Sequence, residues 1–217
     1  MYNTPAYRFD QICGLAHAKR AAEVALTGDH RILFVGCHES DASRLATITN
    51  SVHDQLIAKD GGGCWRLAFV SAPCPCGYYG DPDRECTCDL AAVAKWQNEY
   101  MNRICPDMVL EVPVQNAAAI MGWLRNHLMD GEPHDRLMVR IECNRADMER
   151  LDVLADAACT LLKAAIKSLK MSPNQVKSAL SVANTITCMA GAGKIEAAHM
   201  AEAIQYRPAR LGIGVGG

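Results

Sequence analysis

Apolar positions recur at helical spacing early in the chain and then give way to short continuous runs. Residues 14–27 place alanines and a leucine on one face and charged side chains on the other, which predicts an amphipathic helix. The apolar run at 31–35 predicts a buried strand. Residues 41–59 again show helical spacing, and the glycines at 61–63 end this second predicted helix.

The same alternation continues through the middle of the chain. Residues 64–70 predict a second strand, residues 90–102 a helix, and residues 108–112 a third strand stopped by Pro113. Strand–helix–strand alternation of this kind indicates an α/β fold with a mostly parallel sheet covered by helices.

Beyond this point the pattern becomes helical. Apolar residues around 120–124 predict one helix, and a short apolar run at 137–141 predicts a strand. The spacing then predicts one long helix over 146–168 and a last helix over 195–206.

A local signal marks the start of the helix between these two. Ser172 is placed as the N-cap, Pro173 occupies the first helical position, and Gln175 follows three residues after the cap. This is a capping box, and it predicts a helix that runs to Gly191.

The chain therefore divides into parts of different character. Residues 1–144 form an α/β part, residues 145–210 form a helical part, and we expect the glycine-rich tail at 211–217 to be flexible. With 217 residues, half of them apolar, the chain can bury a proper core.

Charge and cysteine content narrow the setting. The net charge of −2 gives no overall electrostatic signal for nucleic acid, and no apolar run is long enough to span a membrane. The first residues lack the pattern of a secretory signal, and eleven cysteines are an odd number, so we expect a reducing, cytoplasmic setting. Seven cysteines stand singly and are interpreted as small buried apolar residues: Cys13, Cys37, Cys64, Cys105, Cys143, Cys159 and Cys188.

Four cysteines lie in two close pairs within the segment 71–90. Cys74 and Cys76 form the first pair, and Cys86 and Cys88 the second, with a turn-rich loop between them. Two such pairs provide the four thiolates of a tetrahedral zinc site, and a site filled by four thiolates is structural because no position is left for water. The acidic residues of the loop argue against contact with nucleic acid through this hairpin.

Three stretches carry a family resemblance. ICGLAHAKRAAEVALTGDHRILFVG near the start, WRLAFVSAPCPCGYYGD in the middle and LSVANTITCMAGAGKIEAAHMAEAIQYR near the end resemble, in the same order, blocks of the ComM/YifB family of magnesium-chelatase-like AAA+ ATPases. The resemblance implies a truncated AAA+ α/β domain with a phosphate-loop-like parallel sheet, followed by a C-terminal helical lid.

The chain departs from this family where the phosphate-binding loop should be. The aligned residues run from Gly36 to Ser43, with Ser40 also at a family position, but Ala42 stands where the family has its lysine. Glu39 and Asp41 replace glycines, so acids would lie close to a triphosphate. Without the lysine and the glycines, the relic loop of Gly36, Ser40, Ala42 and Ser43 is not expected to bind ATP tightly.

Other parts of the hydrolytic machinery depart as well. No apolar strand ending in two acids occurs between Thr47 and Trp65, so the resemblance provides no ligands for Mg²⁺. The family's lid arginine aligns within 172–174, which reads Ser-Pro-Asn. Its trans-acting arginine aligns with Cys105, although Arg103 could serve after a two-residue shift.

The sequence thus favours a non-catalytic AAA+-derived protein that acts by association, as a pseudo-ATPase subunit, a regulator or a self-associating scaffold. Its partners would be proteins, and intact AAA+ relatives are candidates. Two alternatives stay open: an ATP-binding, helicase-like DNA-remodelling protein, as the family implies, and a small zinc-containing nucleic-acid adaptor.

Overall fold

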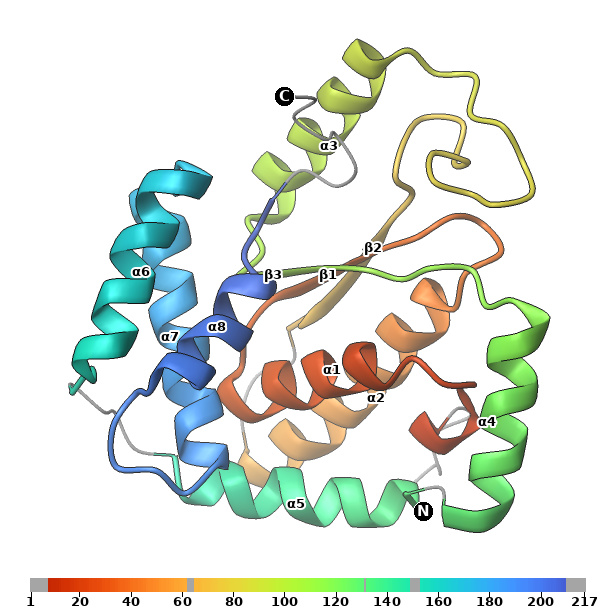
Figure 1. The fold of residues 1–217 in the computed structure, drawn as a ribbon. Helices are drawn as coiled ribbons and strands as arrows, with labels where there is room; N and C mark the ends of the chain where they lie inside the picture. The colour runs from red at the N-terminus through yellow and green to blue at the C-terminus, as the bar shows by residue number, and fades with distance from the viewer. Residues whose placement is uncertain (1–7, 62–64, 131, 149–152, 210–217) are drawn as a thin grey trace.

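A computed structural model describes residues 8–61, 65–130, 132–148 and 153–209. At its centre is a three-stranded parallel sheet with the order β2-β1-β3 (Figure 1). The strands are β1 (Ile32–Val35), β2 (Ala68–Ser71) and β3 (Met108–Glu111). β1 pairs in register with both neighbours, Ile32 lying opposite Ala68 and Met108. The predicted α/β fold with a parallel sheet is confirmed.

Helices cover both faces of this sheet. Alternate residues of β1 point to opposite sides, which is why all four are buried in one continuous apolar run. Ile32 and Phe34 join the large core with α1 (Ala16–Gly28) and α2 (Ala42–Asp60). On the other face, β1 residues pack with Tyr100 and Met101 of α3 (Leu90–Ile104) in a smaller core.

The second half of the described chain is helical. It comprises α4 (Ala117–Asp130), α5 (His134–Ala146), α6 (Asp156–Leu169), α7 (Pro173–Met189) and α8 (Ala197–Gln205). α6, α7 and α8 pack together at one end of the sheet, and we call them the helical unit (Figure 1). The large core continues into this unit through residues such as Ile186 of α7.

Two secondary-structure predictions were wrong. The predicted strand at 137–141 lies inside α5, where Leu137 and Ile141, one helical turn apart, point into the core. The predicted helix over 146–168 begins only at Asp156. Just before it, the amide of Ala155 donates to the carbonyl oxygen of Ile195 at 2.9 Å, so this backbone pairs with a distant segment.

Local signals were read correctly elsewhere. The Ser172 hydroxyl accepts a hydrogen bond from the Gln175 amide at 3.3 Å, and the Gln175 side chain accepts one from the Ser172 amide at 2.8 Å, which confirms the predicted capping box. Among the described helices, none combines the length and the apolar character needed to cross a membrane. The predicted flexible tail at 211–217 lies outside the described residues, as do Cys64 and the glycines at 62 and 63.

The Asn50 side chain covers the start of the outer edge of β2. The Asn50 side-chain oxygen accepts from the amides of Leu67 and Ala68 at 3.0 and 2.9 Å, and its amide group donates to the Ala68 carbonyl at 2.8 Å. Asn50 therefore takes the place of a neighbouring strand. This arrangement protects a short sheet against pairing with another strand edge.

Candidate metal centre

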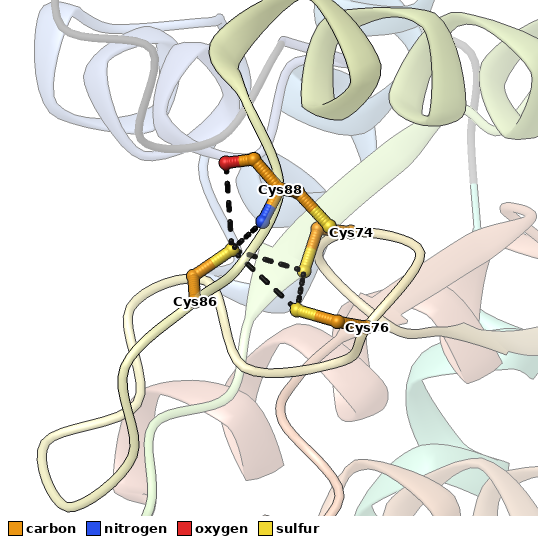
Figure 2. Close-up of side chains that lie close together, drawn as sticks. All are labelled: Cys74, Cys76, Cys86 and Cys88. Atoms are coloured by element: carbon orange, nitrogen blue, oxygen red, sulfur yellow. Dashed lines mark hydrogen bonds between the residues drawn. The ribbon is translucent and has the colours of Figure 1, made fainter.

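Four cysteine sulfurs converge beyond the carboxyl end of β2. The Sγ atoms of Cys74, Cys76, Cys86 and Cys88 all lie within 4.8 Å of one another (Figure 2). Three of the separations are 3.4, 3.7 and 3.5 Å. A tetrahedral ion with metal–sulfur bonds of about 2.3 Å holds its sulfurs about 3.8 Å apart. The quartet identified from the sequence is thus assembled at the spacing of a tetrathiolate site.

The two cysteine pairs come from the two sides of a long turn. Cys74 and Cys76 follow β2, and a tight turn at Gly77 and Gly80, both with φ above +80°, returns the chain. Amide groups point at the sulfurs: the Tyr79 amide donates to Cys74 Sγ at 3.3 Å and the Cys88 amide to Cys86 Sγ at 3.4 Å. Such amides stabilise thiolates, the form that binds metals.

Helix α3 fixes the base of the hairpin. The Trp96 indole donates to the carbonyl of Ala72 at 3.0 Å, and the buried Gln97 side chain donates to the carbonyl of Pro73 at 3.1 Å. Asp89, directly after the second pair, caps α3 by accepting from the Ala92 amide at 2.7 Å. Both ends of the hairpin are therefore attached to one rigid helix.

The thiols of the quartet differ in acidity. The Tyr78 backbone amide, which hydrogen-bonds to the Cys76 sulfur, lowers the pKa of Cys76 to about 5. Desolvation, together with the neighbouring thiols, raises the pKa of Cys86 to about 12. Cys76 is thus the more readily ionised of these two thiols. A bound divalent cation would supply the charge that stabilises all four.

The relic phosphate loop connects β1 to α2. Its residue Ser40 is bonded within the loop, since the Ser40 amide and hydroxyl both donate to the carbonyl of Cys37, at 3.0 and 2.8 Å. A side chain at Gly36 would lie 2.1 Å from the Ser40 hydroxyl. Ala42, at the position of the family's lysine, is buried, whereas Ser43 is exposed.

The cysteine hairpin packs directly on this loop. Cys37 Sγ donates to the carbonyl of Tyr79 at 3.6 Å, and the His38 ring meets the Tyr78 ring edge-on with centroids 5.5 Å apart. Arg84 of the hairpin lies 3.5 Å from the carboxylate of Glu39. No pattern in the sequence predicts this packing, and His38 and Glu39 remain exposed within it.

The helical unit lies at the opposite end of the sheet from the relic loop. Ser178 of α7 donates to Asp107 at 3.0 Å, directly before β3 begins, and the Val109 amide donates to the Tyr206 carbonyl at 2.8 Å. His30, before β1, lies 2.8 Å from the Thr185 hydroxyl. Because the strands are parallel, these contacts mark their amino ends, whereas the relic loop follows the carboxyl end of β1.

Residues that the resemblance aligned with catalytic arginines lie at this amino end. Ser172 and Asn174 line a shallow pocket together with Cys105, which is exposed. Arg103 stacks over the Tyr100 ring with its guanidinium 4.8 Å from the ring centroid. Within the described part of the chain, these four residues lie at the opposite end of the sheet from the relic loop.

The single cysteines are less buried than expected. Cys105 and Cys143 are exposed. Four others are half-buried: Cys13, Cys37, Cys159 and Cys188. Their interpretation as fully buried apolar residues was wrong for these six, because a position on a helix or turn near the surface leaves the small side chain within reach of solvent.

Comparison with protein families supports part of the resemblance. Residues 112–207, from the end of β3 to just beyond α8, match the family model of the magnesium chelatase subunit ChlI C-terminal domain. This stretch, somewhat under half of the chain, is therefore similar to that domain. A search among curated proteins gave no significant match.

Proposed function

We propose that this protein is a non-catalytic relative of the ComM/YifB AAA+ ATPases that acts by association, as a pseudo-ATPase subunit, a regulator or a scaffold. The observation that carries the proposal is the state of the relic loop. Its lysine position is the buried Ala42, its Ser40 hydroxyl donates to the loop's own backbone, and the cysteine hairpin packs on it.

Electrostatics also oppose a nucleotide at this loop. Glu39 and Asp41 stand at positions where the family has glycines, and each has an arginine partner, Arg84 and Arg44. One carboxylate about 5 Å from one phosphate charge costs about 3 kcal/mol at an effective dielectric constant of 20. The arginine partners offset part of this repulsion, but the lysine and the glycines that would hold the phosphates are absent, so we expect ATP not to bind.

The position of the helical unit supports the same proposal. The residues aligned with the family's lid arginine, 172–174, begin α7 at the amino end of the sheet. They also lack an arginine. A nucleotide at the relic loop would thus gain no cationic contact from α7 of the same chain.

For the metal centre we propose a structural Zn²⁺ held by Cys74, Cys76, Cys86 and Cys88. The donor set fits: four sulfurs at tetrahedral spacing favour zinc or iron over the oxygen-seeking cations. With four thiolates the coordination shell is full, so the ion would hold the hairpin together and carry out no chemistry on a substrate. Free thiols throughout the described chain suit the reducing, cytoplasmic setting that we propose.

Metal analysis of purified protein tests the zinc centre. We expect one equivalent of zinc per chain, lost in Cys86→Ser together with order in the hairpin. Cys143→Ser is the matched control, because Cys143 is an exposed cysteine on α5, outside the quartet. Zinc retained in Cys86→Ser, or iron in its place, would contradict the assignment.

Nucleotide binding tests the non-catalytic role. A site occupied at a hundred times its Kd would add about 2.7 kcal/mol to the free energy of unfolding and raise the melting temperature by several degrees. We expect no shift with saturating Mg-ATP and no ATP turnover. A clear shift that disappears when Ser40 is replaced by a bulky residue would favour the alternative, an ATP-binding DNA-remodelling protein.

A further inference from the structure

Charge is divided unequally between two parts of this chain. Residues 157–195, which cover nearly all of α6 and all of α7, contain five lysines and no aspartate, glutamate or arginine. Since the whole chain carries −2, the remainder carries −7. Positive and negative charges are therefore concentrated in different parts of the chain, although its net charge is small.

Three of the lysines gather along the second half of α6 and at its end, and we call them the lysine face. All three are exposed: Lys163 and Lys167 lie about 40° apart around the helix axis and about 6 Å along it, and Lys170 caps the helix directly after Leu169. In the part of the chain that the structure describes, none of them forms an ion pair. Ile166 and Leu169 beside them are 37% and 43% exposed, so the surface also carries apolar side chains.

The opposite charge gathers on the cysteine hairpin, where Asp83, Glu85 and Asp89 form what we call the acidic face. All three are exposed. Arg84 is the one basic residue between positions 72 and 90, and it is occupied by Glu39 and by the Tyr78 hydroxyl. A zinc ion with four thiolates would add a charge of −2 beneath this surface. Leu90, next to Asp89, is 62% exposed.

The two faces cannot meet within one molecule. The lysine face belongs to the helical unit at the amino ends of the strands, and the acidic face follows the carboxyl end of β2, on the far side of the sheet (Figure 1). We propose that the lysine face of one copy docks on the acidic face of a second copy, so that the protein associates head to tail. The inference rests on the proposed function, because it names a second copy as the partner in association.

The side chains favour a protein partner over nucleic acid. The exposed surface of α6 lacks arginines and aromatic rings, which supply most directed contacts to phosphates and bases. Ile166 and Leu169 need an apolar partner, and Leu90 provides one within the acidic face. Both faces thus combine charge with an exposed aliphatic residue, as expected of surfaces that match in charge and in apolar contact.

Sedimentation velocity on the intact, metal-loaded protein tests this contact. We expect the mean mass to rise with concentration at about 0.1 M salt and to fall to that of a monomer near 1 M, where the Debye length shrinks from about 10 to about 3 Å. One variant reverses the lysine face: Lys163→Glu, Lys167→Glu and Lys170→Glu. A second carries Asp83→Lys and Glu85→Lys, and keeps Asp89 because it caps α3.

Each variant alone should associate at least about tenfold more weakly than the wild type, and an equimolar mixture of the two should recover association, because every junction then again joins opposite charges. The control is Arg125→Glu with Arg136→Glu, two exposed positions outside both faces, and it should behave as wild type. Circular dichroism and zinc content verify that each variant folds.

A wild type that stays monomeric at low salt, or a mixture that does not recover, would overturn the inference. So would wild-type protein that binds duplex DNA through the same lysines in place of a second copy. These outcomes leave zinc content and the absence of an ATP response unchanged, so the inference can fail while the proposed function stands. Nucleotide binding, in contrast, would contradict the proposed function without testing the head-to-tail contact.

Discussion

The two ends of the small sheet are stabilised in different ways. At the amino end, the helical unit shares a continuous apolar core with α1 and with β1, and Ile186, Val182 and Ala183 of α7 are buried there. At the carboxyl end, the cysteine hairpin has only Pro73, Cys74 and Gly77 buried among residues 72–89. The amino end is stabilised by burial, whereas the hairpin buries little and is held by its sulfurs and a few hydrogen bonds, such as those to α3.

This difference indicates where an external ion matters. Burying an aliphatic side chain contributes about 1.5–3 kcal/mol, so the amino end can be stable without a ligand. Eighteen hairpin residues cannot recover their conformational entropy, about 1 kcal/mol or more each, from three small buried residues. A metal ion would supply the missing free energy at a single point.

The largest effect should therefore come from removing the metal. We expect chelation at neutral pH to abolish protection of the amides between Cys74 and Cys88 in hydrogen exchange, because their order depends on the ion. The amides of α1 and α7 should stay protected, since their core does not involve the hairpin. Equal loss of protection at both ends would show that the sheet itself depends on the metal and would end the contrast.

A core truncation at the amino end should give the next largest effect. Ile186 is 1% exposed, so Ile186→Ala should lower the free energy of unfolding by about 2–5 kcal/mol. At the hairpin end, Leu90→Ala removes a side chain that is 62% exposed and should change it by less than about 0.5 kcal/mol. Urea unfolding with intact metal measures both, and similar losses would contradict the assignment of burial to one end.

Sequence reasoning succeeded where the signal was local. The capping box at Ser172 and Gln175 predicted the start of α7, because both partners lie within one turn. The spacing of the cysteine pairs likewise identified the quartet, since two short turns bring each pair together. The run at 137–141 was wrongly predicted as a strand because four apolar residues and one arginine fit a strand or a helix equally well. Only the packing of Leu137 and Ile141 into the core determines that this segment is helical.

Long-range placement was not accessible in this way. The contact between His38 and Tyr78 joins two loops that are forty residues apart, and neither has an apolar pattern. At the amino ends of the strands, α7 is held by hydrogen bonds to Asp107 and His30. In the sequence, these polar residues and their partners on α7 look like ordinary surface positions. Such contacts follow from the assembled fold and leave no periodic trace in the sequence.

A smaller effect should distinguish buried from exposed charge at the two ends. Glu23 of α1 has a side chain only 5% exposed, and it accepts hydrogen bonds from Arg20 and Arg140, which joins α1 to α5. Glu39, beside Arg84 of the hairpin, has a side chain that is 58% exposed. Glu23→Gln should cost about 1.5–3 kcal/mol, and the same replacement at Glu39 at most about 1 kcal/mol. Thermal unfolding at low and high salt measures both, and only the Glu39 effect should shrink with salt.

The smallest effect concerns pH at the amino end. Burial lowers the pKa of His30, which lies against Thr185, so the folded state favours the neutral ring. Because the folded pKa is the lower one, this contribution is present above the unfolded value near 6.5 and is lost as pH falls towards the folded value. His134, whose pKa burial also lowers, acts in the same direction.

Stability should then decline below about pH 6.5, with each histidine contributing a slope of at most about 1.4 kcal/mol per pH unit. Acid also weakens metal binding by thiolates, so the decline of the wild type alone is ambiguous. The difference between wild type and His30→Gln cancels that contribution, since His30 lies at the end of the sheet remote from the sulfurs. Urea unfolding, repeated at several pH values across this range, should show a shallower decline for His30→Gln. Parallel curves would show that His30 contributes nothing to the pH response.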